Sequence, residues 1–200
     1  MRLLELDKNC FMNWWEELPV GSTMVVQPKI DGCAIALRYK YGQLVDAYSR
    51  QNPRVIEIIK CINSIPLSID DSLKVEVELE GVLYSPTFSS NFSKEQFISD
   101  SGMLNETKES LAFIAFHIFS SKSDELSDLT QLQKWGFEVP ITLRTEDPRQ
   151  VQIWHTQWIN NELFSNLPTN GIVAKCNSSS LKDSLGVTSS SSNRALALTR

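Results

Sequence analysis

The stretch VVQPKIDGCAIALRYKYGQLVDAYSR, residues 25–50, predicts two strands joined by a tight turn and carries a charged residue just before them. The alternating apolar residues over 33–39 indicate a strand with one buried face. Tyr41 and Gly42 form the expected turn, and the run 44–49 completes a hairpin. Lys29 lies between a proline and this sheet. It is therefore either a surface residue in a tight turn or a buried amine with a chemical role.

Helices and strands follow each other in mixed order along the rest of the chain. Helices are expected over 11–18, from Pro53 onward, over 125–135 with Gly136 as the stop, and over 148–164. Strands are expected over 24–27, 73–84, 111–119 and, as the final buried strand, 171–175. The serine-rich segment 178–192 is expected to form a loop. Since strands occur in hairpins as well as between helices, the order predicts an α+β fold rather than a doubly wound sheet.

The composition excludes several classes of protein. Of the 200 residues, 42% are hydrophobic and 22% are charged, as in ordinary globular domains. The chain has no apolar run of the ~18 residues that a membrane span requires, and its start lacks the clean apolar run of a signal peptide. Its four cysteines have no CxxC spacing, which argues against a zinc site or a disulfide framework and fits a reducing cytoplasm.

The net charge bears on nucleic-acid partners. A net charge of −5 argues against strong binding of nucleic acid by this chain alone, because such binding normally needs a basic face. If the protein acts on nucleic acid, we expect other modules or partner proteins to do most of the holding.

An acidic strand supplies candidate ligands for a cation. In KVEVELEGVLY, residues 74–84, the side chains of Glu76, Glu78 and Glu80 share one face because side chains alternate along a strand. Taken alone, this pattern favours a solvated face. The alternative is a cleft in which these carboxylates bind a metal or another cation. The KIDG segment also allows two interpretations, a surface turn or a reactive lysine. The second is possible because an amine that is partly desolvated or near other cations loses its proton more easily and becomes a nucleophile.

The order of the motifs favours the chemical interpretation. QPKIDG is followed by YSR, then by VEVELEG, by LAFIAFHIF and by NGIVAK. This series resembles the adenylation domain of bacterial NAD-dependent DNA ligases, which are covalent nucleotidyltransferases. The connecting segments LLELDKNCF, IKCINSIPLSI, LQKWGFEV and SLKDSLGVTS also resemble that family, so the similarity spans most of the chain in the right order.

The resemblance implies a fold and an activity. The fold would be an ATP-grasp-like nucleotidyltransferase core of antiparallel and mixed sheets flanked by helices, with a nucleotide cleft between the sheets. It would form a single adenylation domain over 1–200, without the nicotinamide-binding, OB, zinc, helix-hairpin-helix and BRCT regions of the ligases. The activity would be transfer of AMP from NAD, or from ATP, to a lysine with the help of magnesium. This is the first step of nucleic-acid ligation, with nicked DNA or another nucleic acid as the acceptor.

The resemblance also implies roles for individual residues. Lys29 would attack the α-phosphorus, Asp31 would orient the sugar or its neighbours, and Lys175 would stabilise charge on the α-phosphate. Glu80 would be the carboxylate of the third motif and a metal ligand, with Glu78 as the other possible assignment.

Further residues would contact the nucleotide. Gly32 would let the backbone approach it, Arg50 would hold the ribose or phosphate side, and Gln27 stands where the family usually has a glutamate that touches adenine. Phe116 would stack on adenine, although ordinary strand packing explains an aromatic there equally well. Asn170 completes this set.

Three departures from the family pattern suggest an alternative. Asn170 replaces the aspartate that begins the fourth motif, and Thr199 stands where a catalytic lysine is expected. Arg200 is adjacent, but side-chain alternation would point it to the other face. The segment 85–107 also lacks the arginine that the family carries there. The alternative is a catalytically impaired homologue that binds a nucleotide or a partner protein. A third interpretation, an RNA-ligase-like or capping-type transferase, shares the KxDG motif but lacks the connector matches.

Overall fold

The computed structural model describes residues 4–6, 8–49, 55–70, 76–86, 111–119, 121–179, 187–188, 191–192 and 195–200. These residues form two units, each built around its own sheet. Unit 1 comprises Met1–Ile30, Lys122–Ser127 and Ile141–Arg200, and unit 2 comprises Asp31–Ser121 and Asp128–Pro140.

Unit 1 contains a five-stranded sheet in the order β1-β11-β8-β2-β7. Its strands are β1 (Leu4–Leu6), β2 (Met24–Ile30), β7 (Leu143–Thr145), β8 (Thr169–Cys176) and β11 (Ala195–Leu198). The β1–β11 pair is parallel and the other pairs are antiparallel. A separate short ladder joins β9 (Val187–Thr188) to β10 (Ser191–Ser192).

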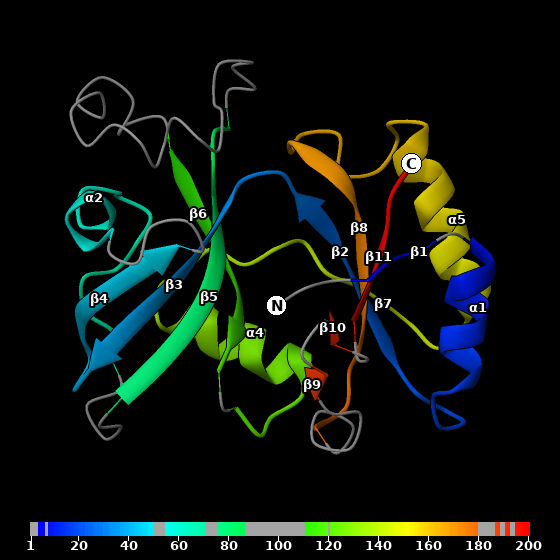
Figure 1. Cartoon of the computed structure of the whole chain (residues 1–200), viewed down its shortest axis with the longest axis horizontal. Coiled ribbons are helices and arrows are strands. Elements are labelled where there is room, and N and C mark those ends of the chain that lie inside the picture. Colours follow the sequence, from blue (N-terminus) through cyan, green and yellow to red (C-terminus); the bar gives the residue numbers. More distant parts are fainter. Residues whose placement is uncertain are drawn as a thin grey trace. The chain divides into compact units, whose positions relative to one another are not determined.

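Two helices cover one face of this sheet. They are α1 (Lys8–Glu16) and α5 (Pro148–Ile159), drawn in blue and yellow in Figure 1. Their apolar side chains pack against alternate residues of the central strands, and the core includes Phe11, Val151, Trp158, Val26 and Ile172. Because alternate strand residues point to opposite faces, the intervening residues of β2 and β8 lie on the face away from the helices.

Unit 2 contains an antiparallel sheet in the order β4-β3-β5-β6. Its elements are β3 (Cys33–Lys40), β4 (Gln43–Ser49), α2 (Ile56–Ile59), β5 (Glu76–Tyr84), β6 (Ala112–Ile118) and most of α4 (Glu125–Lys134). Tyr39 and Phe113 each contact Phe137, with ring centroids 6.2 and 6.1 Å apart, so the segment after α4 closes the core on this sheet.

The predicted α+β fold is confirmed, including the hairpin. Tyr41 and Gly42 have φ angles of 47° and 76°, the conformation of a two-residue hairpin turn. Gly136 ends α4 with a φ of 89°, as expected for a glycine after a helix.

Several predicted features of the helices and strands are wrong. Segment 171–175 is not the final buried strand, because β11 follows it and pairs along it. The helix from residue 148 ends at Ile159 rather than at residue 164, and Asn161 and Phe164 adopt positive φ. Among the described helices, none has the length and apolar character needed to span a bilayer.

Candidate functional site

Lys29 lies at an irregularity in β2. Pro28 pairs with Ile172 and Ile30 with Thr169 of β8, so the register shifts at the intervening lysine. Proline has no N–H to donate, and a proline inside a sheet is typically found at such a shift. Lys29 is half-buried here. It is therefore neither a freely exposed turn residue nor a core residue.

Gly171 makes room for Lys29 on the neighbouring strand. A β-carbon built on Gly171 would lie 3.3 Å from Cδ of Lys29, 3.2 Å from Cγ2 of Thr199 and only 2.6 Å from the carbonyl oxygen of Leu198. A larger residue would collide with backbone, which cannot move aside easily. The side chains of Lys29 and Thr199 thus flank the same glycine.

The other candidate residues of unit 1 follow the same face of the sheet. Val25 pairs with Lys175 and Gln27 with Val173, so these side chains alternate with the residues packed under the helices. Gln27 is almost fully buried and donates from Nε2 to Oγ1 of Thr142 over 3.0 Å. This arrangement brings Lys29, Gln27 and Lys175 onto the face that α1 and α5 leave uncovered.

Lys175 is buried and forms an ion pair. Its Nζ donates to Oε2 of Glu125 over 3.3 Å, and the two side chains are 6% and 3% exposed. Glu125 is the first residue of α4, and the Leu126 N–H donates to Oδ1 of Asn177 over 3.1 Å. The end of β8 therefore holds the first turn of α4 at two points.

The charge of Glu125 also affects the pKa of the next residue of β8, Cys176. Burial raises the pKa of the Cys176 thiol, and the nearby Glu125 carboxylate raises it further, whereas a hydrogen bond with Ser22 lowers it. Because the thiolate is the reactive form, this thiol is held in its inert state at neutral pH.

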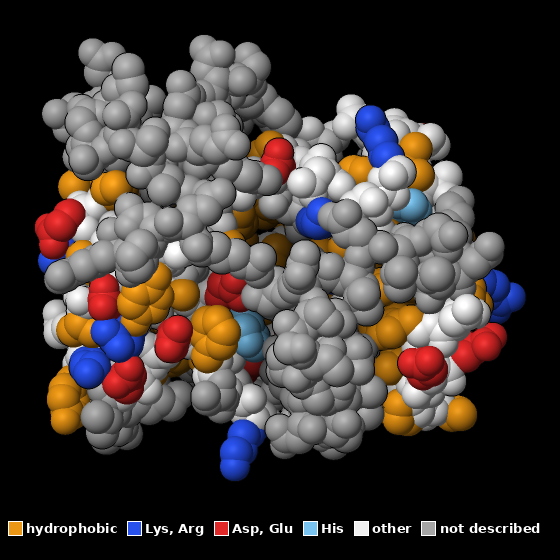
Figure 2. Space-filling model, viewed as in Figure 1, with side chains coloured by type: hydrophobic (Ala, Val, Ile, Leu, Met, Phe, Trp, Pro, Cys, Tyr) orange, Lys and Arg blue, Asp and Glu red, His pale blue; other side chains and the backbone are white. Residues whose placement is uncertain are grey.

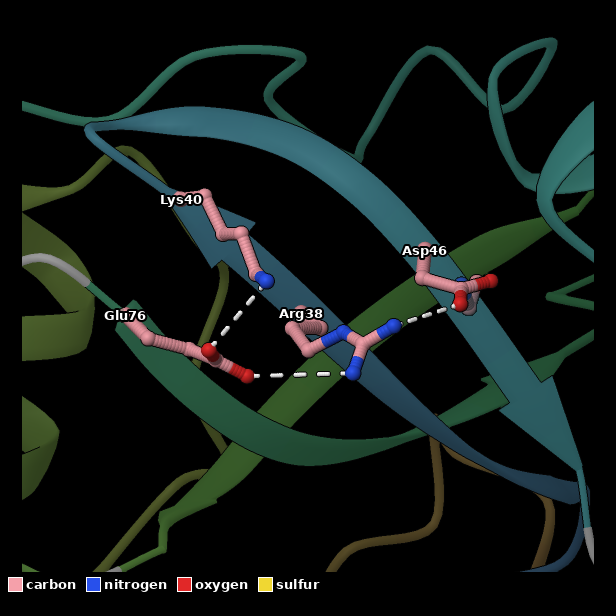
Figure 3. Close-up of polar contacts among 5 residues, drawn as sticks. Arg38, Lys40, Asp46 and Glu76 are labelled. Atoms are coloured by element: carbon pink, nitrogen blue, oxygen red, sulfur yellow. Dashed lines mark hydrogen bonds and ion pairs between the residues drawn. The ribbon is translucent and has the colours of Figure 1, made fainter.

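The acidic strand β5 divides into two parts. Glu76 is exposed and lies 3.5 Å from Nζ of Lys40 and 3.8 Å from Nη1 of Arg38, which also bonds Asp46 through Nη2 over 2.8 Å (Figure 3). For this part, the solvated-face interpretation is correct. Glu80 is different, because it is buried and has Ala36 and His117 as cross-strand neighbours.

The remaining candidates lie in unit 2 or outside the described residues. Asp31 is exposed at the start of the unit, and Phe116 is half-buried where the β5–β6 register shifts. A β-carbon on Gly32 would lie 2.4 Å from the carbonyl oxygen of Leu83, so close strand packing already requires glycine there. Asn170 is exposed beside Gly171 on β8. Arg50, and most of the segment expected to lack an arginine, lie outside the described residues.

Sequence reasoning missed Glu125 and the role of Gly171 as a spacer. An acid at the start of a helix is common and gives no sign of burial. Arg200 behaves as expected for the residue after Thr199, because its guanidinium carbon lies 5.5 Å from the ring centre of Trp158 on α5. The backbone of Thr199 is fixed as well, since Nε2 of His155 lies 3.0 Å from its carbonyl oxygen.

Sequence comparison identifies relatives among the DNA ligases. Residues 8–97 match the family described as the NAD-dependent DNA ligase adenylation domain. The DNA ligase of Mycoplasma genitalium is 30% identical over 196 residues, covering 86% of this chain and 29% of the ligase. That of Cytophaga hutchinsonii is 26% identical over 200 residues, covering 86% and 30%. The chain thus spans about 30% of the length of these relatives, and its resemblance to the ligase family is confirmed.

Comparison of structures supports the fold. A Lig E DNA ligase superposes with a TM-score of 0.61 at 12% identity, covering all of this chain and 68% of the other. A putative ATP-dependent DNA ligase from Aquifex aeolicus gives 0.60 at 13% identity, covering 100% and 49%. An archaeal ATP-dependent RNA ligase gives 0.62 at 12% identity, covering 100% and 47%. The predicted nucleotidyltransferase fold is therefore correct.

Proposed function

We propose that this relative of the NAD-dependent DNA ligase adenylation domains forms a covalent lysyl-AMP on Lys29. The observation that carries the proposal is the position of Lys29. It is half-buried at a strand irregularity, its side chain passes over Gly171, and it lies inside the segment that matches the family. This environment places the Lys29 side chain on the sheet face opposite α1 and α5.

The transfer is a substitution at phosphorus. The neutral amine of Lys29 attacks the α-phosphorus and forms a P–N bond, while the bond from that phosphorus to the bridging oxygen breaks. The leaving group is nicotinamide mononucleotide when NAD is the donor and pyrophosphate when ATP is the donor. The proton lost by the amine passes to solvent.

Charge on the phosphate needs compensation in this step. Lys175 lies on the same face of the sheet as Lys29, and its ammonium is our candidate for stabilising the α-phosphate oxygens. Magnesium, when bound, would neutralise phosphate charge further. Magnesium is commonly held by one or two carboxylates together with phosphate oxygens, so the buried carboxylate of Glu80 is our candidate ligand.

The nucleotide contacts remain proposals from the family resemblance. Gln27 and Phe116 would contact adenine, and Asp31 and Arg50 would contact the sugar or its phosphate. Gly32 would allow close approach of the backbone, and Asn170 would offer an amide in place of a carboxylate.

The donor and the acceptor are proposed in order of support. NAD is the first donor to test because of the family match, and ATP is the second. Nicked DNA is the proposed acceptor, held with the help of further modules or partner proteins in a reducing cytoplasm. On the face of unit 2 drawn in Figure 2, Lys and Arg side chains are interspersed with Asp and Glu side chains, which would give little grip on a phosphate backbone.

A second candidate function is supported by Thr199 and Asn170. Thr199 flanks Gly171 opposite Lys29, where the family resemblance calls for a lysine, and a hydroxyl cannot supply its positive charge. On this alternative the chain binds a nucleotide or a partner protein without self-adenylation.

The intact mass of the purified protein separates these functions. It is measured before and after incubation with magnesium and NAD or, separately, ATP. We expect a gain of one AMP that disappears in Lys29→Ala and persists in Lys60→Ala, a control lysine exposed on unit 2. If neither donor adds mass to the folded protein, the adenylation proposal is wrong and the binding function takes its place.

A further inference from the structure

We propose that Glu125 is a positioning residue for adenylyl transfer, acting through Lys175. The inference rests on the proposed function and names a residue that the family resemblance did not supply. The Glu125 carboxylate would fix the direction of the Lys175 ammonium while that ammonium stabilises the α-phosphate.

Lys175 and Glu125 form a buried pair. Lys175 and Glu125 have side chains only 6% and 3% exposed, and Nζ and Oε2 are 3.3 Å apart. A buried ammonium requires an opposite charge or hydrogen bonds to offset its lost hydration. An ammonium has three N–H donors, so bonding to Glu125 is compatible with donation to a phosphate oxygen at the same time.

The Glu125 carboxylate is fixed in place by the elements around it. Glu125 begins α4, where a negative charge is favoured by the helix dipole. The next backbone N–H, that of Leu126, is bonded to Asn177, two residues beyond Lys175 on the same chain segment. The N–H of Asn177 in turn donates to the Thr23 carbonyl oxygen over 2.8 Å. The carboxylate and the amine it bonds are therefore anchored to the same end of the sheet.

Lys175 lies on the face of the sheet that carries the proposed nucleophile. It shares with Gln27 and Lys29 the face that α1 and α5 do not cover. A purely structural ion pair could lie anywhere in the core. This one includes the lysine that the proposed chemistry uses, so its carboxylate controls the direction in which that lysine points.

A double-mutant cycle tests the proposal with single-turnover rates of AMP addition, followed by intact mass at saturating donor. The variants are Glu125→Gln, Lys175→Gln and the double variant. Glu57→Gln serves as control because it removes an exposed carboxylate whose partner is Lys60. We expect Glu125→Gln to slow the step by roughly 10- to 100-fold, because an aimed charge at the phosphate is lost. In the Lys175→Gln background, the same change should alter the rate by less than about twofold.

The outcomes are separable. A purely structural role for Glu125 would give equal fractional losses in both backgrounds, and that result overturns the inference while the proposed function stands. Equal rates for Glu125→Gln and the wild type also overturn it. If Glu125→Gln does not fold, Glu125→Asp replaces it, because aspartate keeps the charge but withdraws it by one methylene. A slower rate in Glu125→Asp than in the wild type, with no such difference in the Lys175→Gln background, carries the same conclusion. If the wild type gains no AMP, both the proposed function and this inference are wrong.

Discussion

At residue 199 the chain has a hydroxyl where the family resemblance calls for an ammonium. Thr199 and Lys29 flank Gly171, so a longer, charged side chain at 199 would start next to the proposed nucleophile. The backbone there is held by His155, which keeps the residue in place whatever its side chain. Charge is therefore the main property that this position lacks.

We predict that Thr199→Lys accelerates AMP addition by about 10- to 100-fold, since it supplies a cation near the phosphate. Single-turnover rates followed by intact mass would measure the change. Thr156→Lys is the matched control, because it adds the same charge at an exposed position on α5. An unchanged rate in Thr199→Lys would show that Thr199 is not the cause of any impairment.

Residues of the site could be predicted only where they belong to a local sequence motif. Lys29 follows from QPKIDG and Thr199 from its distance along the last motif. The buried state of Glu125 does not follow from local sequence, because it depends on Lys175, 50 residues later in the chain. The requirement for glycine at position 171 is likewise not local, because the carbonyl oxygen of Leu198 on a neighbouring strand leaves no room for a β-carbon.

At the scale of elements, the start of α5 was easier to predict than its end. Asp147 and Pro148 mark the start of α5, whereas the chain leaves the helix after Ile159 through residues that adopt positive φ, although apolar residues continue beyond. The strand β11 escaped prediction because ALAL is short and follows a serine-rich segment. Its burial in the sheet comes from pairing with β8, a tertiary effect.

The first turn of α5 yields a pH prediction. The Arg149 backbone N–H donates to the Asp147 carboxylate over 2.9 Å, and this bond, with help from the Arg149 side chain, lowers the pKa of Asp147. A carboxyl with a lower pKa in the folded state stabilises above its unfolded pKa of about 3.9 and loses that contribution as the pH falls through its folded pKa.

We therefore expect Asp147→Ala to lower Tm at pH 7 by about 2–4 °C, while Asp147→Asn keeps most of the cap. The gap between the wild type and Asp147→Ala should narrow as the pH falls below about 4. Thermal unfolding from pH 3 to pH 7 measures it. A gap that is independent of pH would mean that the charge of this cap contributes nothing.

At the scale of the whole molecule, neither unit is a continuous piece of chain. Unit 1 is assembled from three segments and unit 2 from two, so the chain passes between the units four times, after residues 30, 121, 127 and 140. If one unit unfolds, the segments of the other unit that lie between its parts in the sequence lose their anchor at both ends. This connectivity favours one cooperative transition over two independent ones.

We predict that the two units unfold together in denaturant. Cys33 is buried in unit 2 and Cys176 in unit 1, and each becomes reactive only when its own unit opens. Pulse alkylation at increasing urea concentration, with each site resolved by peptide mass, gives one unfolding curve per unit. Cys61 is the control, because it is exposed and should react before any urea is added. Coincident midpoints for Cys33 and Cys176 support a single cooperative domain over this chain. Midpoints that differ by more than the fitting error would instead make the two units separate folding domains.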